Sequence, residues 1–163
     1  MADNPYLVAP GAGRAVALHD LRIIHKVRGD AVAGALSIVE HIIQPKVLVK
    51  PHRHTREDEI SIVLRGSIWA RVGDREFEAP AGSYLVKPRN IGHAIWNLGP
   101  GPSLVAEIVS PAGFEQYFDE IAPVLLGHGP DFDAQFYAIA ERYGIVPEDA
   151  WSNELQKKYG IHL

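Results

Sequence analysis

The chain has 163 residues, of which 47% are hydrophobic and 22% charged, and its net charge is −4. This length fits one domain with a core of its own, and the scattered lysines and arginines argue against a nucleic-acid or anionic-membrane surface. The chain has no cysteine, which excludes disulfides, thiolate metal sites and cysteine nucleophiles, so any metal must be held by nitrogen and oxygen.

The N-terminal stretch MADNPYLVAPGAG contains an early acidic residue and two prolines, and it has no apolar segment of the kind that a secretory signal needs. No apolar run in the sequence approaches membrane-spanning length. We therefore expect a cytoplasmic protein in which this stretch forms an N-terminal arm.

Short runs rich in β-branched and aromatic residues follow the arm, and turn sequences separate them. The runs are ALSIVEHII, EISIVL, SIWARV, SYLVKP, HAIWNL and SLVAEIVS. The turn in VGDREF is typical of a tight hairpin with Gly73 at positive φ. Many short strands at this spacing predict a sandwich or a barrel.

The last third of the chain changes to helical spacing of its apolar residues. A first helix is predicted to begin near Pro111 and to end or kink at Pro123, a second to run from Asp131 to Gly144, and a third to open at Pro147. The predicted organisation is an N-terminal arm (1–14), a β-barrel (15–110) and a helical extension packed on the barrel (111–163).

The stretch KPHRHTREDEISIVLRG places two histidines one residue apart. Because side chains alternate across a strand, His52 and His54 point to the same face. Only one of Asp58 and Glu59 can share that face. Glu59 is the better candidate, since the apolar residues at 60, 62 and 64 would form an outward row that packs against a second layer. We expect Asp58 and Glu57 to be loop or surface charges.

A third imidazole could reach the same interior from the stretch GSYLVKPRNIGHAIWN, in which His93 opens a strand. The other histidines on predicted strands, His25 and His41, could line the cavity, but we favour surface or satisfied core positions for both. Trp69 and Trp96 are expected to lie in the core.

Two spacings in these stretches resemble the motifs of the cupin family. The first, H-x-H-x4-E-x6-G, is carried by His52, His54, Glu59 and Gly66. The second, G-x5-P-x4-H-x3-N, is carried by Gly82, Pro88, His93 and Asn97. The chain departs from the family pattern where two turn glycines are usual, which here are Lys46 and Asn90.

This resemblance implies a mainly β protein, a cupin jelly-roll β-barrel (double-stranded β-helix) with one divalent metal ion inside it. The implied ligands are His52, His54, Glu59 and His93. Nitrogen and oxygen ligands of this kind favour iron, manganese, nickel, cobalt, copper or zinc over calcium. Three neutral imidazoles and one carboxylate leave positive charge on the ion and room for a substrate oxygen or dioxygen.

With SPAGFEQYFDEI after the barrel, the sequence is similar to small bacterial single-domain cupins grouped with quercetin 2,3-dioxygenases. The resemblance implies a metal-dependent oxidoreductase, a dioxygenase of a small oxygenated aromatic or enolisable substrate, in which Glu59 takes the substrate proton. Two alternatives stay open: an isomerase or lyase that uses the metal as a Lewis acid, and a non-catalytic module that binds a small ligand.

Cupins often dimerise by pairing or exchanging N-terminal strands. The apolar stretch RAVALHDLRIIHKV would otherwise leave an open sheet edge, so we expect a homodimer.

Overall fold

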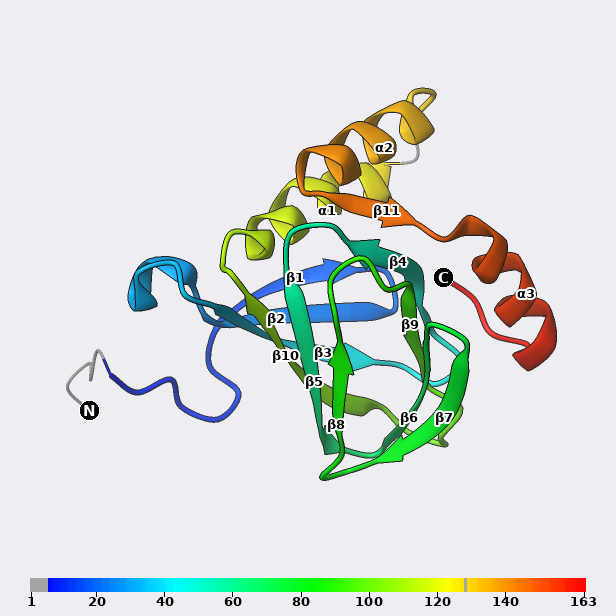
Figure 1. The fold of residues 1–163 in the computed structure, drawn as a ribbon, viewed down its shortest axis with the longest axis horizontal. Coiled ribbons are helices and arrows are strands. Elements are labelled where there is room, and N and C mark those ends of the chain that lie inside the picture. The colour runs from blue at the N-terminus through cyan, green and yellow to red at the C-terminus, as the bar shows by residue number, and fades with distance from the viewer. Residues whose placement is uncertain (1–5, 128) are drawn as a thin grey trace.

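The computed structural model describes residues 6–127 and 129–163. Residues 1–5 of the predicted arm and His128 of the predicted loop before the second helix lie outside the described residues. Two antiparallel sheets form the body of the molecule, and the last third of the chain lies against them (Figure 1). The chain thus has the mainly β fold with C-terminal helices that the sequence predicts.

The first sheet has six strands in the order β1-β2-β3-β10-β5-β8. These strands are β1 (Arg14–Leu18), β2 (Leu21–Val27), β3 (Ser37–Ile43), β10 (Ser103–Ser110), β5 (Asp58–Arg65) and β8 (Tyr84–Lys87). The second sheet has five strands in the order β11-β4-β9-β6-β7. They are β11 (Ile145–Pro147), β4 (Leu48–His54), β9 (His93–Trp96), β6 (Ser67–Val72) and β7 (Arg75–Pro80).

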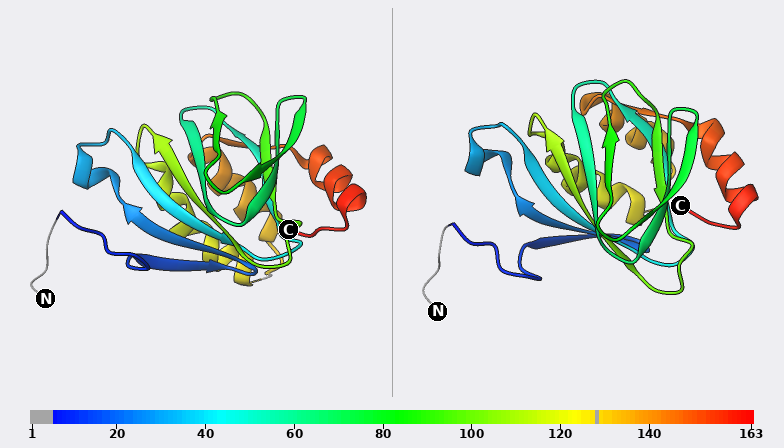
Figure 2. Two further views of the ribbon diagram at one scale, coloured as in Figure 1. Left: turned by 90° about the horizontal axis from the view of Figure 1, so that it is seen from below. Right: turned by 60° about the horizontal axis from the view of Figure 1, so that its bottom comes forward.

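The barrel core lies between the inner faces of these two sheets, which Figure 2 shows from two further sides. Val63 and Val105 of the first sheet pack with Ile68 and Ile95 of the second in one buried cluster. Burial alternates along β3, as expected for a strand with one face in the core. The alternation fixes which side chains can reach the interior.

The two departures from the cupin glycine pattern lie at turns that need a left-handed backbone. Lys46 has φ 69° and Asn90 has φ 65°. Gly66 has φ 78°, and a Cβ there would lie 2.7 Å from Ser103 Oγ, so the motif glycine is required by close approach. Asn97 also holds a turn, because its side-chain amide donates to the carbonyls of residues 43 and 101 at 2.9 Å.

Three α-helices follow the last long strand: α1 (Tyr117–Gly127), α2 (Phe132–Arg142) and α3 (Asp149–Tyr159). Two short 3-10 helices, η1 (Gly29–Val32) and η2 (Phe114–Gln116), precede them. None of the helices in the described residues is both long and apolar enough to cross a membrane.

The helices cover two different parts of the barrel. Figure 1 shows α1 and α2 together beside β11 at one end, and α3 along the side formed by β9, β6 and β7. In the first cluster Phe118 and Phe136 pack with Val39 and Val109 of the first sheet. In the second, Leu155 of α3 packs with the outer side of β4 and β9, where Trp96 is fully buried. The extension therefore closes one end of the barrel and covers the outer face of the second sheet.

The sequence analysis predicted that Pro123 ends or kinks the first helix, and the structure excludes the first alternative because Pro123 lies inside α1. Two other details differ from the sequence prediction. Pro147 does not open the third helix but ends β11, a strand that the sequence analysis missed. The outward row of β5 is not covered by a second layer, since among the described residues Ile60 and Leu64 remain 36% and 47% exposed.

Candidate metal centre

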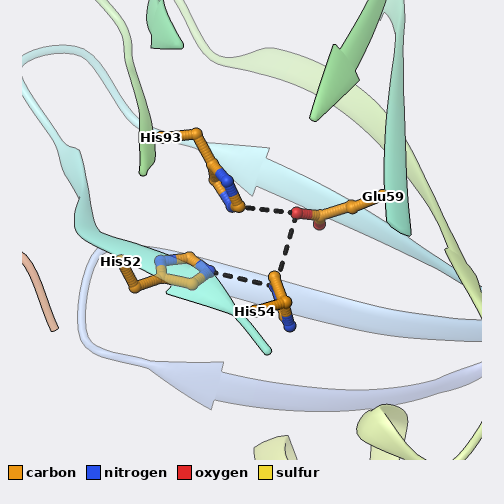
Figure 3. Close-up of side chains that lie close together, drawn as sticks. All are labelled: His52, His54, Glu59 and His93. Atoms are coloured by element: carbon orange, nitrogen blue, oxygen red, sulfur yellow. Dashed lines mark hydrogen bonds and ion pairs between the residues drawn. The ribbon is translucent and has the colours of Figure 1, made fainter. Parts of the chain in front are cut away.

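The four predicted ligands converge inside the barrel from three strands (Figure 3). His52 and His54 lie on β4, His93 opens the adjacent strand β9, and Glu59 comes from β5 of the opposite sheet. His52 pairs directly with His93 in the ladder between β4 and β9. The ligand atoms of all four lie within 4.8 Å of one another. The structure thus brings together the four residues that the sequence analysis proposed as ligands.

The spacing of these atoms suits a common ion. The Nε2 atoms of His52 and His54 are 3.2 Å apart, and Glu59 Oε2 lies 3.1 Å from His93 Nε2 and 3.5 Å from His54 Nε2. Two ligands bound at about 2.1 Å to one ion at angles of roughly 90–109° lie about 3.0–3.4 Å apart. These three pairs therefore need shifts of at most a few tenths of an ångström to bind a common ion, and the other pairs lie within 4.8 Å.

Backbone carbonyls orient two of the imidazoles. His52 Nδ1 lies 2.6 Å from the carbonyl oxygen of Lys50, and His93 Nδ1 lies 3.2 Å from that of Ile91. A carbonyl oxygen only accepts, so each Nδ1 carries the proton and each Nε2 turns its lone pair into the cluster. This arrangement is typical of histidines that bind a metal through Nε2.

The third imidazole is oriented by a carboxylate that the sequence analysis placed wrongly. Glu57 was expected on the surface, but it is only 6% exposed and its Oε2 lies 3.4 Å from His54 Nδ1. Asp58, by contrast, is exposed as expected and pairs with Arg89 at 2.6 Å. The turn after β4 brings Glu57 back against the strand, a placement that alternation alone does not predict.

The electrostatics of the cluster favour a cation. Burial lowers the pKa of His54, but Glu57 and Glu59 outweigh burial and raise that pKa to about 9. Burial and the neighbouring imidazoles of His93 and His54 lower the pKa of His52 well below its usual value. His52 therefore offers a free lone pair at neutral pH, and a metal ion could replace the proton that the two carboxylates stabilise on His54.

Glu59 is also part of a buried network of charged and polar side chains. Lys87 Nζ lies 3.0 Å from Glu59 Oε2 and 2.9 Å from Glu107 Oε2, and Ser61 donates to the same Glu107 oxygen at 2.8 Å. Burial raises the pKa of Glu107 to about 7 against the opposing effect of Lys87. Burial also favours the neutral form of Glu59, but Lys87 and the imidazoles hold its pKa well below the usual value. Glu59 is thus ionised at neutral pH.

A cavity of about 500 Å³ opens beside the cluster, and His52 and Glu59 line it. Its other walls come largely from the helical extension. The aromatic residues that line it are Phe114, Tyr117, Phe118, Phe132, Phe136 and Tyr137. This volume lies within the range of roughly 300–1,000 Å³ typical of small-molecule sites.

The remaining predicted core residues divide into two groups. Trp69 and Trp96 pack in the cluster beneath α3, as expected for core residues, and do not line the cavity. His25 is also buried away from the cavity. His41 lines the cavity, which is the alternative that the sequence analysis disfavoured.

The fold and the cluster define a small β-barrel protein with an interior site that could hold one metal ion. The family model described as Cupin domain matches residues 39–109, which include all four predicted ligands. Residues 39–109 therefore match a cupin domain, and the chain has the cupin fold. No curated protein matches the sequence.

Solved structures share this fold at low sequence identity. KdgF from Halomonas sp. has a TM-score of 0.57 and 20% identity over 63% of this chain and 90% of that one. A predicted oxalate decarboxylase from Thermotoga maritima has a TM-score of 0.54 and 18% identity, and the match covers 56% of this chain and 80% of that one. A cupin-superfamily sugar phosphate isomerase from Silicibacter pomeroyi has a TM-score of 0.51 and 18% identity, and the match covers 57% of this chain and 60% of that one. At these identities the similarity concerns the fold alone.

Proposed function

We propose that this chain is a metal-dependent oxidoreductase, a dioxygenase that acts on a small oxygenated aromatic or enolisable compound. The observation that carries the proposal is the position of the His52, His54, Glu59 and His93 cluster at one side of a cavity with aromatic walls. Such walls suit a planar apolar ring, and the cluster suits an ion that would meet an oxygen on that ring.

When bound, a divalent metal would supply the positive charge that polarises a substrate oxygen. The chain's own residues would accept the substrate proton and exclude water. Glu59, ionised and facing the cavity, would accept the proton of a substrate hydroxyl, and Lys87 at 3.0 Å would hold the carboxylate in place. The aromatic residues of η2, α1 and α2 would exclude water from the reacting end.

An isomerase or lyase that uses the metal only as a Lewis acid is the second candidate. The names of the isomerase from Silicibacter pomeroyi and the predicted decarboxylase from Thermotoga maritima favour it. The cavity is less suited to a sugar phosphate, because a phosphate group needs positive charge. Lys50 is the single lysine or arginine among the described residues that line the cavity. Lys50 is also paired with Asp149 at 3.0 Å.

The first experiment is elemental analysis of protein purified without chelator or added metal. We expect one transition-metal ion per chain, and His93→Ala should lose most of it while the barrel stays folded. His25→Ala is the matched control, because it removes a buried histidine outside the cluster and should leave the metal content unchanged. Full metal retention in His93→Ala would remove His93 from the ligand set.

Oxygen uptake then separates the two candidate functions. The loaded protein is assayed with an oxygen electrode against a panel of flavonols and β-diketones, and we expect oxygen consumption that disappears in His93→Ala. Conversion of a compound without oxygen uptake would instead support the isomerase or lyase. Binding without conversion would indicate a ligand-binding module.

A further inference from the structure

Tyr117, the first residue of α1, lines the cavity and has no role in the proposed metal cluster. Its hydroxyl has no hydrogen-bond partner among the described residues, and burial alone raises its pKa. Unlike the unpaired ring nitrogens of His41, which protein atoms enclose, the Tyr117 oxygen keeps accessible surface. A hydroxyl that is screened from bulk solvent, unpaired and still accessible points into the cavity that its residue lines.

Two other polar residues of the cavity already have partners. Tyr137 donates to Asp149 Oδ2 at 2.9 Å, and Lys50 Nζ lies 3.0 Å from Asp149 Oδ1. Nearly all buried polar groups in folded proteins find a hydrogen-bond partner, because leaving one unsatisfied is costly. Since the described protein atoms offer the Tyr117 hydroxyl no such partner, a molecule bound in the cavity is the natural one.

Aromatic contacts place Tyr117 close to the metal cluster but outside it. Its ring stacks on that of Phe114, with centroids 5.2 Å apart and an interplanar angle of 16°. The same Phe114 ring meets the ring of His54 edge-on at 4.5 Å. Phe114 therefore lies between Tyr117 and the cluster, and a flat molecule packed on this wall could contact Glu59 or the ion with one part and Tyr117 with another.

The surroundings of the hydroxyl indicate which kind of oxygen it would meet. Phe118 stands edge-on to Tyr117 at 5.7 Å, so apolar rings flank this part of the cavity. Burial keeps the hydroxyl protonated at neutral pH, and it can donate one hydrogen bond and accept another. The single lysine or arginine among the described lining residues, Lys50, is already paired, so an uncharged hydroxyl or carbonyl suits this position better than a phosphate or a carboxylate.

We infer that Tyr117 is a specificity-determining residue whose hydroxyl binds a second oxygen of a flat aromatic substrate, while the first oxygen meets the metal cluster. The assignment rests on the proposed function for that first contact and adds a second one, supplied by the helical extension. Two separate polar contacts fix how the aromatic ring is oriented towards the cluster. They also define the substrate class more closely, as aromatic compounds that carry hydroxyl or carbonyl groups at two separate positions.

A matched pair of fluorescent probes tests this assignment. 2,6-Dihydroxynaphthalene carries a hydroxyl on each ring of a flat two-ring system, whereas 2-naphthol carries one hydroxyl on the same system. We expect the protein to bind the dihydroxy probe more tightly, because only that probe can use both polar contacts at once. Binding is measured by probe fluorescence in the absence of oxygen, so that no turnover occurs, with protein as purified and after treatment with EDTA.

Variants assign the preference to the Tyr117 hydroxyl. Tyr117→Phe keeps the ring and should reduce the preference for the dihydroxy probe by about 2- to 12-fold, the ratio that one net hydrogen bond supplies. Tyr143→Phe is the matched control, because Tyr143 contacts the Tyr117 ring with centroids 5.8 Å apart but does not line the cavity, and its hydroxyl donates to Glu120 at 2.6 Å. It should keep the full preference.

Three results would overturn the assignment. The first is a preference that survives unchanged in Tyr117→Phe, and the second is a wild-type protein that binds both probes equally. The third is an equal loss of affinity for both probes in Tyr117→Phe, which would indicate lost packing rather than a lost hydrogen bond.

The same measurements separate this assignment from the proposed function. If the assignment fails but the purified protein contains metal and EDTA weakens the binding of 2-naphthol, the proposed function stands. If the purified protein contains no metal, the proposed function is contradicted. The preference and its dependence on Tyr117 should then persist, because the contact with the second hydroxyl does not require the ion.

Discussion

The buried lysine beneath the candidate metal centre offers the sharpest test of the interior electrostatics. Lys87 is 3% exposed and bridges the carboxylates of Glu59 and Glu107 at 3.0 and 2.9 Å. Burial lowers the pKa of Lys87, but the two carboxylates outweigh burial and raise that pKa, so the ammonium group stays charged. Lys87→Met keeps most of the side-chain volume and removes the charge, leaving two carboxylates buried without their shared partner.

The expected cost follows from that arrangement. Removing one partner of a buried ion pair costs about 3–5 kcal/mol in the free energy of unfolding. For a domain of this size, that loss lowers the melting temperature by about 6–20 °C. A divalent ion bound at Glu59 would supply part of the missing positive charge, so we expect a smaller loss in metal-loaded protein than in EDTA-treated protein.

Urea unfolding of both forms measures the two losses. Lys158→Met is the matched control, because Lys158 pairs with Glu76 at 2.7 Å but its side chain is 51% exposed, and such surface pairs contribute about 0–1 kcal/mol. If Lys87→Met also lost no more than about 1 kcal/mol, the idea that Lys87 neutralises the interior carboxylates would be wrong. Equal losses with and without metal would show that the ion does not bind beside Glu59.

Two further predictions concern pH and assembly. Burial would raise the pKa of Glu115, but the backbone N–H groups of Gly29 and Gly113 donate to its carboxylate at 3.0 and 2.7 Å, and the pKa is lowered overall. The stability that this carboxylate contributes is therefore present above the unfolded pKa of about 4.5 and is lost as the pH falls through the folded pKa. Glu115→Gln should therefore be less stable by about 1.5–3 kcal/mol at pH 7, with a difference that shrinks below pH 4.5 in urea unfolding, and a difference constant with pH would contradict this account. We also propose that the chain forms a homodimer through β1, which pairs only with β2 among the described strands and so leaves one edge open. Analytical ultracentrifugation should then give a mass of twice 17.9 kDa, and a monomer would refute this proposal.

The sequence by itself predicted a β-barrel, and strand alternation together with the resemblance to the cupin motifs predicted which residues form the cluster. Alternation along a strand is a local property, so the spacing of His52 and His54 was enough to place both on one face. The same rule separated Glu59 from Asp58, which the structure places on opposite faces of β5. The positive φ of Lys46 and Asn90 shows that the turns are kept even where glycine is not.

The tertiary structure alone decided what surrounds the cluster. The strand Ile145–Pro147 is three residues long and exists because it pairs with His52–His54, a contact across about ninety residues of chain that no local pattern encodes. The burial of Glu57 depends on how a turn folds back, and the position of His41 at a cavity depends on the helical residues that line the same cavity. Strand periodicity says which way a side chain points, but whether it meets a packed core, an open cavity or solvent depends on segments distant in the sequence.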